Sequence, residues 1–221
     1  MSELLELNSQ IQSCQKCPQL ITYIEGVAKN KVKRFMDQEY WGKPVPSFGD
    51  QNARLFIVGL APAAHGANRC GRMFTGDSSG DWLFKALYET GFANQPQSLS
   101  ANDGMELNDA YVSSVIHCAP PANKPSREEI QNCSSYLSKE IEALKEMKVL
   151  LCLGQISFKQ VCNVLGLGKH KFGHGVVLSG LKDFSILSSY HPSRQNTQTG
   201  RLKWAEWLSV FELAKAMIKK H

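Results

Sequence analysis

A chain of 221 residues, 43% apolar and 20% charged, is long enough to bury a complete core as one globular domain. It has no apolar run long enough to cross a bilayer and no basic-then-apolar secretory signal, so we expect a cytoplasmic protein. The formal net charge of +5 arises in residues 26–54 and 201–221, where Lys and Arg exceed the acids. This excess predicts either solvated surface or contact with nucleic acid.

Apolar runs and helical patterns alternate along the chain. The runs at residues 55–59, 110–117, 149–154 and 184–189 have the composition of buried strands. Helical patterns occupy residues 81–91, 126–148, 155–165 and 202–220. The second of these helices opens with a capping box from Ser126 to Glu129. This alternation predicts an α/β fold in which helices cover both faces of a parallel sheet.

Seven cysteines in a reducing compartment are not expected to form a disulfide framework, which leaves metal ligation, catalysis or core packing. Cys14 and Cys17 form a C-x-x-C sequence, which alone is a weak signal. Cys118 follows the second predicted strand, and the short loop between it and Cys133 lets the two approach each other. Four such thiolates can hold zinc or an iron–sulfur cluster, and spacing does not choose between them. The others have the patterns of core or incidental residues: Cys70, Cys152 and Cys162.

A glycine-rich stretch, residues 59–77, directly follows the first predicted strand. Its glycines let the backbone turn and approach a ligand closely. Between them stand one His, two Arg, one Phe and one Asp, which suit a polar or anionic ligand with an aromatic group better than a core. Asp77, the only acid of the stretch, is either the N-cap of the next helix or a catalytic carboxylate. Because other caps are available nearby, we favour catalysis.

Polar sequences also follow the second and fourth predicted strands, at residues 118–121 and 189–201. Ligands of parallel sheets bind at the carboxyl ends of the strands. We therefore expect these segments and the glycine-rich stretch to gather at one edge of the sheet. This position favours a functional role for His191 over that of an ordinary surface histidine.

These three regions resemble the signature regions of the uracil-DNA glycosylase superfamily, in particular its family 5, the B-type iron–sulfur enzymes. The matching sequences are Gly-Leu-Ala-Pro-Ala-Ala-His-Gly-Ala-Asn-Arg (residues 59–69), Cys-Ala-Pro-Pro-Ala-Asn-Lys-Pro (118–125) and His-Pro-Ser-Arg-Gln-Asn-Thr-Gln-Thr-Gly-Arg-Leu (191–202). The resemblance implies one domain over residues 1–221, a three-layer α/β/α sandwich with a four-stranded parallel sheet, and an N-terminal extension over residues 1–50. It also implies a [4Fe–4S] cluster on Cys14, Cys17, Cys118 and Cys133.

By the same resemblance, the protein is a base-excision repair glycosylase that acts on DNA. It would flip uracil out of the stack and hydrolyse the N-glycosidic bond, leaving an abasic site. Asp77 would position or deprotonate the water and stabilise the oxocarbenium-like sugar, and His191 would donate a hydrogen bond to the base carbonyl. Asn123 would be a third active-site polar group, with a turn residue as the alternative. Phe74 would stack on the flipped base, with core packing as the alternative.

The resemblance also implies further contacts with substrate and DNA. The substrate-binding candidates are Gly59, Leu60, Ala61, His65, Gly66, Asn68 and Ser114. The DNA-binding candidates are Arg69, Arg72, Arg194, Gln195, Asn196 and Arg201, joined by Lys203. For the charged residues, solvated surface is the alternative.

Departures from the family pattern predict a loosely selective pocket. Ser114 stands where many relatives with strict uracil preference carry Asn, whose amide reads the edge of uracil. Leu60 and Ala61 stand where other branches carry an acid. We therefore expect activity on other deaminated or damaged bases too, such as hypoxanthine or ethenocytosine.

We expect a monomer. Two alternatives of other classes remain: a non-catalytic metal-cluster module that binds nucleic acid, and a nucleotide phosphohydrolase. The phosphohydrolase is disfavoured because the Gly-Lys-Ser/Thr ending of a phosphate loop is absent from the sequence. The binding module does not require an acid such as Asp77 facing DNA phosphates.

Overall fold

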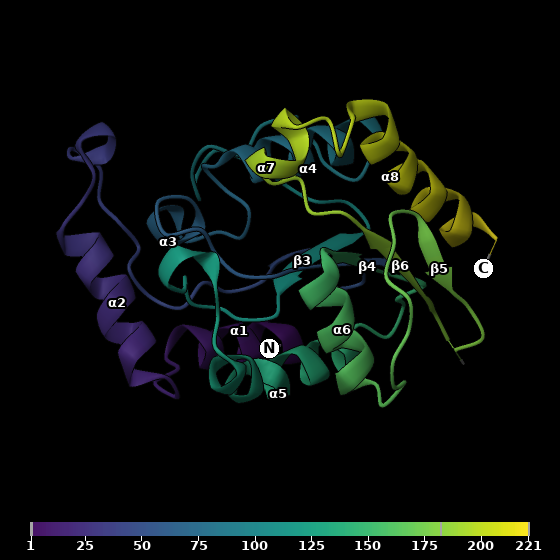
Figure 1. Ribbon diagram of the computed structural model, residues 1–221, viewed down its shortest axis with the longest axis horizontal. Helices are drawn as coiled ribbons and strands as arrows, with labels where there is room; N and C mark the ends of the chain where they lie inside the picture. Colours follow the sequence, from purple (N-terminus) through teal and green to yellow (C-terminus); the bar gives the residue numbers. More distant parts are fainter. Residues whose placement is uncertain (1, 182, 221) are drawn as a thin grey trace.

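A computed structural model describes residues 2–181 and 183–220 and has three layers, a sheet between two sets of helices (Figure 1). The strand order is β1-β3-β2-β4-β6-β5. The four middle strands run parallel: β2 (Leu55–Gly59), β3 (Ala110–Ser114), β4 (Val149–Leu153) and β6 (Ser185–Ser189). The predicted α/β/α sandwich is confirmed.

The sheet has six strands in the described residues, not the four that the resemblance implied. β1 (Phe48–Gly49) and β5 (Val176–Leu178) pair antiparallel with the two outer parallel strands. Both are short and partly exposed, so neither forms the apolar run by which a buried strand is recognised.

Alternating side chains of the parallel strands pack into two cores, one on each face of the sheet. In β2, Phe56 and Val58 face one core, while Leu55 and Ile57 face the other. The first core is covered by α1 (Glu3–Gln12), α2 (Pro18–Lys29), α5 (Arg127–Ala143) and α6 (Gln155–Val164). The second is covered by α4 (Ser78–Glu89) and α8 (Trp204–Lys219). Figure 1 shows α1, α5 and α6 below the sheet and α4 and α8 above it.

Four short helical elements complete the described fold, and they are too short for the apolar pattern of the sequence to reveal them. They are α3 (Ala67–Cys70), α7 (Arg194–Gln198), and the 3₁₀ turns η1 (Lys33–Phe35) and η2 (Pro121–Asn123). The capping box of α5 is confirmed, because Ser126 accepts from the Glu129 amide and Glu129 accepts from the Ser126 amide. Cys152 and Cys162 are buried core residues, as expected.

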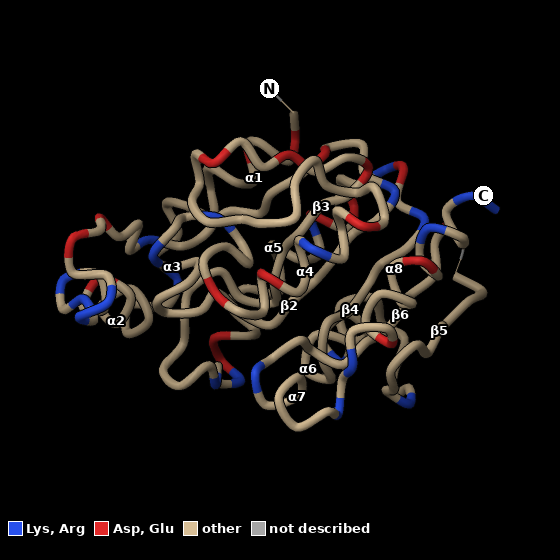
Figure 2. Tube along the Cα trace, turned by 90° about the horizontal axis from the view of Figure 1, so that it is seen from above, with Lys and Arg blue, Asp and Glu red and all other residues tan. Residues whose placement is uncertain are grey.

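The two basic segments do not form one surface. Figure 2 shows Lys and Arg gathered beside α2 at one end of the molecule and near the C-terminus at the other. The basic residues near the C-terminus therefore lie at the opposite end of the molecule from those beside α2. Among the described residues, no helix combines the length and apolar character needed to span a membrane.

A buried carboxyl group joins α5 to the sheet and to the N-terminal segment. Glu140 is fully buried and accepts hydrogen bonds from the hydroxyls of Ser47 and Ser113. Asn8 extends this network, since its amide nitrogen donates to the carbonyl of Ser47 at 3.0 Å. No cation pairs with Glu140 in the described chain, and burial raises its pKa to about 7.

Glu140→Gln is expected to stabilise the fold increasingly as pH rises. The folded state holds the Glu140 proton more tightly than the unfolded chain, whose ordinary pKa is 4.5. The stability contributed by this group is therefore full below that pH and is lost as pH rises through about 7. The variant lacks this loss. Each unit of pKa difference between the folded and unfolded states corresponds to about 1.4 kcal/mol in the free energy of unfolding.

Urea unfolding at a series of pH values measures the difference. Glu142→Gln, at an exposed position of the same helix, is the matched control. If the free energy of unfolding of the Glu140 variant, relative to the parent, does not grow between pH 5 and pH 8, the assignment of a neutral buried acid is contradicted.

Candidate active site

The carboxyl ends of the parallel strands lie side by side and carry the predicted polar segments. Gly59 is in register with Ser114, and Leu153 with Ser189. The glycine-rich stretch, the loop after β3 and the loop after β6 therefore start from one edge of the sheet, as expected.

Asp77 uses one carboxylate oxygen as a helix cap and leaves the other free. Its Oδ1 accepts from the backbone amides of Ser79 at 2.9 Å and Gly80 at 3.0 Å, at the start of α4. Its Oδ2 makes no hydrogen bond within the described chain. Burial raises the pKa of Asp77 more than the two amides lower it. The cap and the catalytic role, weighed as alternatives in the sequence, are thus compatible in one side chain.

Gly66 lies against that free oxygen. A Cβ atom at this position would stand 2.5 Å from Asp77 Oδ2 and 3.0 Å from Asp77 Cβ. The close approach requires a glycine, so the glycine-rich stretch fixes the position of the carboxylate.

Phe74 and His191 form a stacked pair above the end of β2. Their ring centroids are 6.1 Å apart with an interplanar angle of 26°. A Cβ atom on Gly59 would lie 2.6 Å from Cζ of Phe74, so the ring rests on the strand's last residue. Phe74 has a left-handed φ of 55°, which is uncommon for an aromatic residue and typical of strained functional positions.

His191 is neutral over the physiological range, because burial lowers its pKa to about 4. Its main-chain carbonyl accepts from Asn196 Nδ2 at 2.8 Å, which holds the loop in place. Neither ring nitrogen of His191 has a hydrogen bond among residues 2–181 and 183–220. Asn196, predicted to contact DNA, thus positions His191 through its amide.

A cleft of about 340 Å³ opens beside His191. Three further predicted residues line it: Leu60, Asn196 and Arg201. The sequence interpretation missed the other seven: Leu153, Gly154, Gln155, Ile156, Ser157, Phe172 and Tyr190. Gln155 and Ile156 directly follow β4, so the rule that ligands bind after strand ends could have found them. Phe172 lies in a loop without a recognisable motif.

Tyr190 in the wall of the cleft contacts Arg201 and His174. The guanidinium of Arg201 lies 4.8 Å from the centroid of its ring, and the imidazole of His174 stacks on it at 5.3 Å. Arg201 is exposed, as are Arg194, Gln195 and Lys203. Arg194 donates to Ser78 Oγ at 3.2 Å, next to Asp77. These four remain candidates for contact with DNA.

Two predicted DNA or substrate contacts are internal, and the prediction for them is wrong. Arg72 is 5% exposed and forms an ion pair with Asp103 at 2.6 Å, which leaves no free face for a phosphate. Asn68 is completely buried, with its amide nitrogen 3.4 Å from the carbonyl of Ala64. Both side chains stabilise the glycine-rich stretch from inside, and sequence spacing does not distinguish such buried side chains from exposed ones.

The segment at residues 35–42 braces the glycine-rich stretch from outside. Tyr40 hydroxyl lies 3.1 Å from His65 Nδ1, and the main-chain amide of Trp41 donates to the carbonyl of Arg69 at 2.9 Å. The Arg69 guanidinium stacks on Phe35 at 4.0 Å and donates to the carbonyl of His65 at 2.8 Å. Arg69, predicted to contact DNA, and His65, predicted to contact substrate, are therefore both engaged by contacts within the fold.

Three other predicted residues lie near the strand ends. Ser114 is buried, and its hydroxyl donates to the carbonyl of Ile116 at 2.6 Å. Asn123 is exposed in η2 with a left-handed φ of 54°, a conformation that Asn tolerates, so the turn and functional roles both remain open. Ala61 is half-buried directly after Leu60.

Four thiols gather against the first core. Cys118 and Cys133 are buried there, and Cys14 and Cys17 pack against the same cluster. Burial and the neighbouring thiols raise the pKa of Cys118, and burial raises that of Cys133 to about 12. In the described residues, no three His, Cys, Asp or Glu side chains come together as ligands of one metal ion.

Comparison with known proteins agrees with this arrangement. Residues 46–214 match the family model described as the uracil DNA glycosylase superfamily. A type-5 uracil-DNA glycosylase of Pyrobaculum aerophilum is 45% identical over 94% of this chain and 90% of its own length. The type-5 enzyme of Mycobacterium leprae is 44% identical over 96% and 94%, and that of Thermus thermophilus 42% over 94% and 94%. The chain belongs to the uracil DNA glycosylase superfamily, within its type-5 branch.

Proposed function

We propose that this protein is a DNA-repair hydrolase that removes uracil by cleaving its N-glycosidic bond and leaves an abasic site. The observation that carries the proposal is the free Oδ2 of Asp77, held beside Gly66 at the edge where the glycine-rich stretch and the His191 loop meet. The family membership argues against both a nucleotide phosphohydrolase and a non-catalytic module.

The reaction places charge at two points. The base must leave the stack, and as the bond breaks the sugar becomes cation-like and the base anion-like. Asp77 Oδ2 is available to orient the attacking water and to stabilise the sugar, and its raised pKa makes it a stronger base. His191 is neutral, and a neutral imidazole still has one N–H group that can donate a hydrogen bond to the base oxygen. Phe74 offers a ring face next to His191.

The pocket is proposed to accept other deaminated or damaged bases, such as hypoxanthine or ethenocytosine. Support comes from Ser114, whose hydroxyl is engaged by the main chain and offers no free donor to read a base edge. Leu60 adds only apolar surface to the cleft. We also propose that the enzyme is cytoplasmic and works as a monomer.

Asp77→Asn is expected to lower the single-turnover rate of uracil release by about 100-fold or more. Asn caps helices as well as Asp does, so the fold is retained while the carboxylate is lost. Alkali-labile sites in a uracil-containing oligonucleotide measure the rate. Asp81→Asn, which removes the next acid of the same helix turn, is the matched control and keeps the parent rate.

The same assay includes matched oligonucleotides with hypoxanthine and ethenocytosine. Release of all three bases by the parent protein supports the loose pocket, and release of uracil alone would rule it out. If Asp77→Asn keeps the parent rate, Asp77 is only a cap.

We further propose that Cys14, Cys17, Cys118 and Cys133 hold a [4Fe–4S] cluster. Support comes from the donor set, which is four thiols against one core. They come from the N-terminal C-x-x-C sequence of residues 14–17 (the knuckle), the loop after β3, and α5. A cluster spreads its ligands over several iron atoms, so it does not need them as close together as one ion does. Bound there, the cluster would tie the knuckle to the sheet and contribute to folding.

The knuckle already docks on α5 beside these thiols. Lys16 donates to Ser135 Oγ at 3.0 Å and lies 4.4 Å from the ring centroid of Tyr136. Asn132 Nδ2 lies 3.4 Å from Cys17 Sγ. The residues present therefore fit a thiolate-bound group at this place.

Cys118→Ala and Cys133→Ala are each expected to give colourless, poorly soluble protein with little iron or acid-labile sulfide. Iron and sulfide analysis of protein purified without air measures the loss. Cys162→Ala, which removes a core thiol outside the proposed set, is the control and keeps the brown colour. A brown, stable Cys133 variant would remove that residue from the ligand set.

A further inference from the structure

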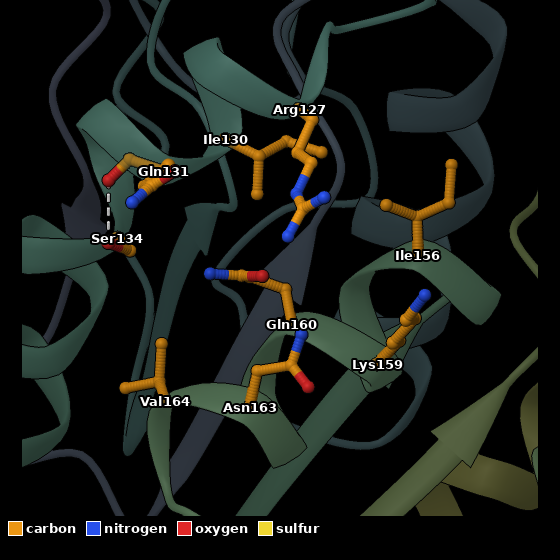
Figure 3. A pocket seen from close by; sticks show the side chains of 9 residues that line it. All are labelled: Arg127, Ile130, Gln131, Ser134, Ile156, Lys159, Gln160, Asn163 and Val164. Atoms are coloured by element: carbon orange, nitrogen blue, oxygen red, sulfur yellow. Dashed lines mark hydrogen bonds between the residues drawn. The ribbon is translucent and has the colours of Figure 1, made fainter. Parts of the chain in front are cut away.

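A second hollow, of about 900 Å³, lies between α5 and α6 (Figure 3). Its walls are the first two turns of α5, from Arg127 to Ser134, and the length of α6, from Ile156 to Val164. The proposed chemistry at Asp77 and the proposed cluster use none of these residues. The hollow is therefore a feature that excision itself does not explain.

The lining of this α5–α6 groove favours an anion. It contains two cations, Arg127 and Lys159, and the three amides of Gln131, Gln160 and Asn163, but no carboxylate. Figure 3 shows the side chains of Arg127 and Gln160 pointing toward each other across the hollow. Neither cation has an ion pair or a side-chain hydrogen bond to any described residue, so their donors are available. Arg, Lys, Gln and Asn side chains are the groups that contact the sugar–phosphate backbone of DNA.

The groove adjoins the candidate active site. Ile156 lines both the groove and the cleft that contains His191. This residue stands in the first turn of α6, which follows β4 after Gly154, and it is 46% exposed. A strand that leaves the cleft past Ile156 reaches the groove without crossing another element.

We propose that the α5–α6 groove binds phosphates of the DNA strand that carries the excised base, at nucleotides flanking it. The inference rests on the proposed function, since it assumes that DNA occupies the cleft. Arg127 and Lys159 would neutralise backbone phosphates, and the amides would bind the same backbone without reading sequence. Affinity for long substrates would then exceed affinity for short ones that end inside the cleft.

The test compares Arg127→Ala/Lys159→Ala with Lys139→Ala/Lys145→Ala, which removes the same charge from exposed positions outside the groove. Both are made in the Asp77→Asn background, so that excision does not consume the DNA during the measurement. Fluorescence anisotropy gives dissociation constants for a short and a long uracil-containing single strand over a range of salt concentrations.

The groove variant is expected to bind the long strand several-fold more weakly and the short strand as the parent does. Its salt dependence should be shallower by about 0.7 in the log–log slope for each phosphate contact removed. Binding of the long strand equal to that of the control variant would overturn the proposal and leave the groove to a partner other than DNA. Failure of the proposed function would appear separately, as absence of abasic sites with the parent protein.

Discussion

The amides of Ser79 and Gly80 hold one oxygen of Asp77 at the start of α4, and the candidate site is arranged around this fixed carboxylate. The two hydrogen bonds lower the pKa of Asp77 and burial raises it, and the effect of burial is the larger. The helix thus orients the group while the buried position increases its basicity. A side chain that only capped α4 would not need a glycine placed against its second oxygen.

Close packing around that carboxylate explains much of the unusual sequence before it. Gly59 admits the ring of Phe74, and Gly80 admits its carbonyl oxygen, so the left-handed conformation of Phe74 is enforced from two sides. The segment at residues 35–42 holds the glycine-rich stretch from outside through Tyr40 and Trp41. Further along the chain, Ser47 donates a hydrogen bond to Glu140, which connects this part of the chain to the core. Fixed geometry of this kind is what catalysis by positioned groups requires.

The sequence was sufficient for the parallel sheet, because four apolar runs and the helices between them leave few arrangements. It was also sufficient to place the glycine-rich stretch and the His191 loop at one edge, because both follow the carboxyl ends of parallel strands. It could not separate Arg72 from Arg201, since both are arginines in polar stretches, and only the fold shows that Asp103 buries the first. The edge strands and the α5–α6 groove depend on packing between distant segments, which no local pattern encodes.

The central claim, that the glycine-rich stretch exists to hold the Asp77 carboxylate, is tested most directly by Gly66→Ala. A Cβ atom added at Gly66 would stand 2.5 Å from Asp77 Oδ2 and 3.0 Å from Asp77 Cβ, so the carboxylate must move. Moving the carboxylate to relieve this contact is expected to slow single-turnover uracil release by about 100-fold while the protein remains folded. Gly26→Ala, with open space at its Cβ, should keep the parent rate. A Gly66 variant that releases uracil as fast as the Gly26 variant would contradict the account.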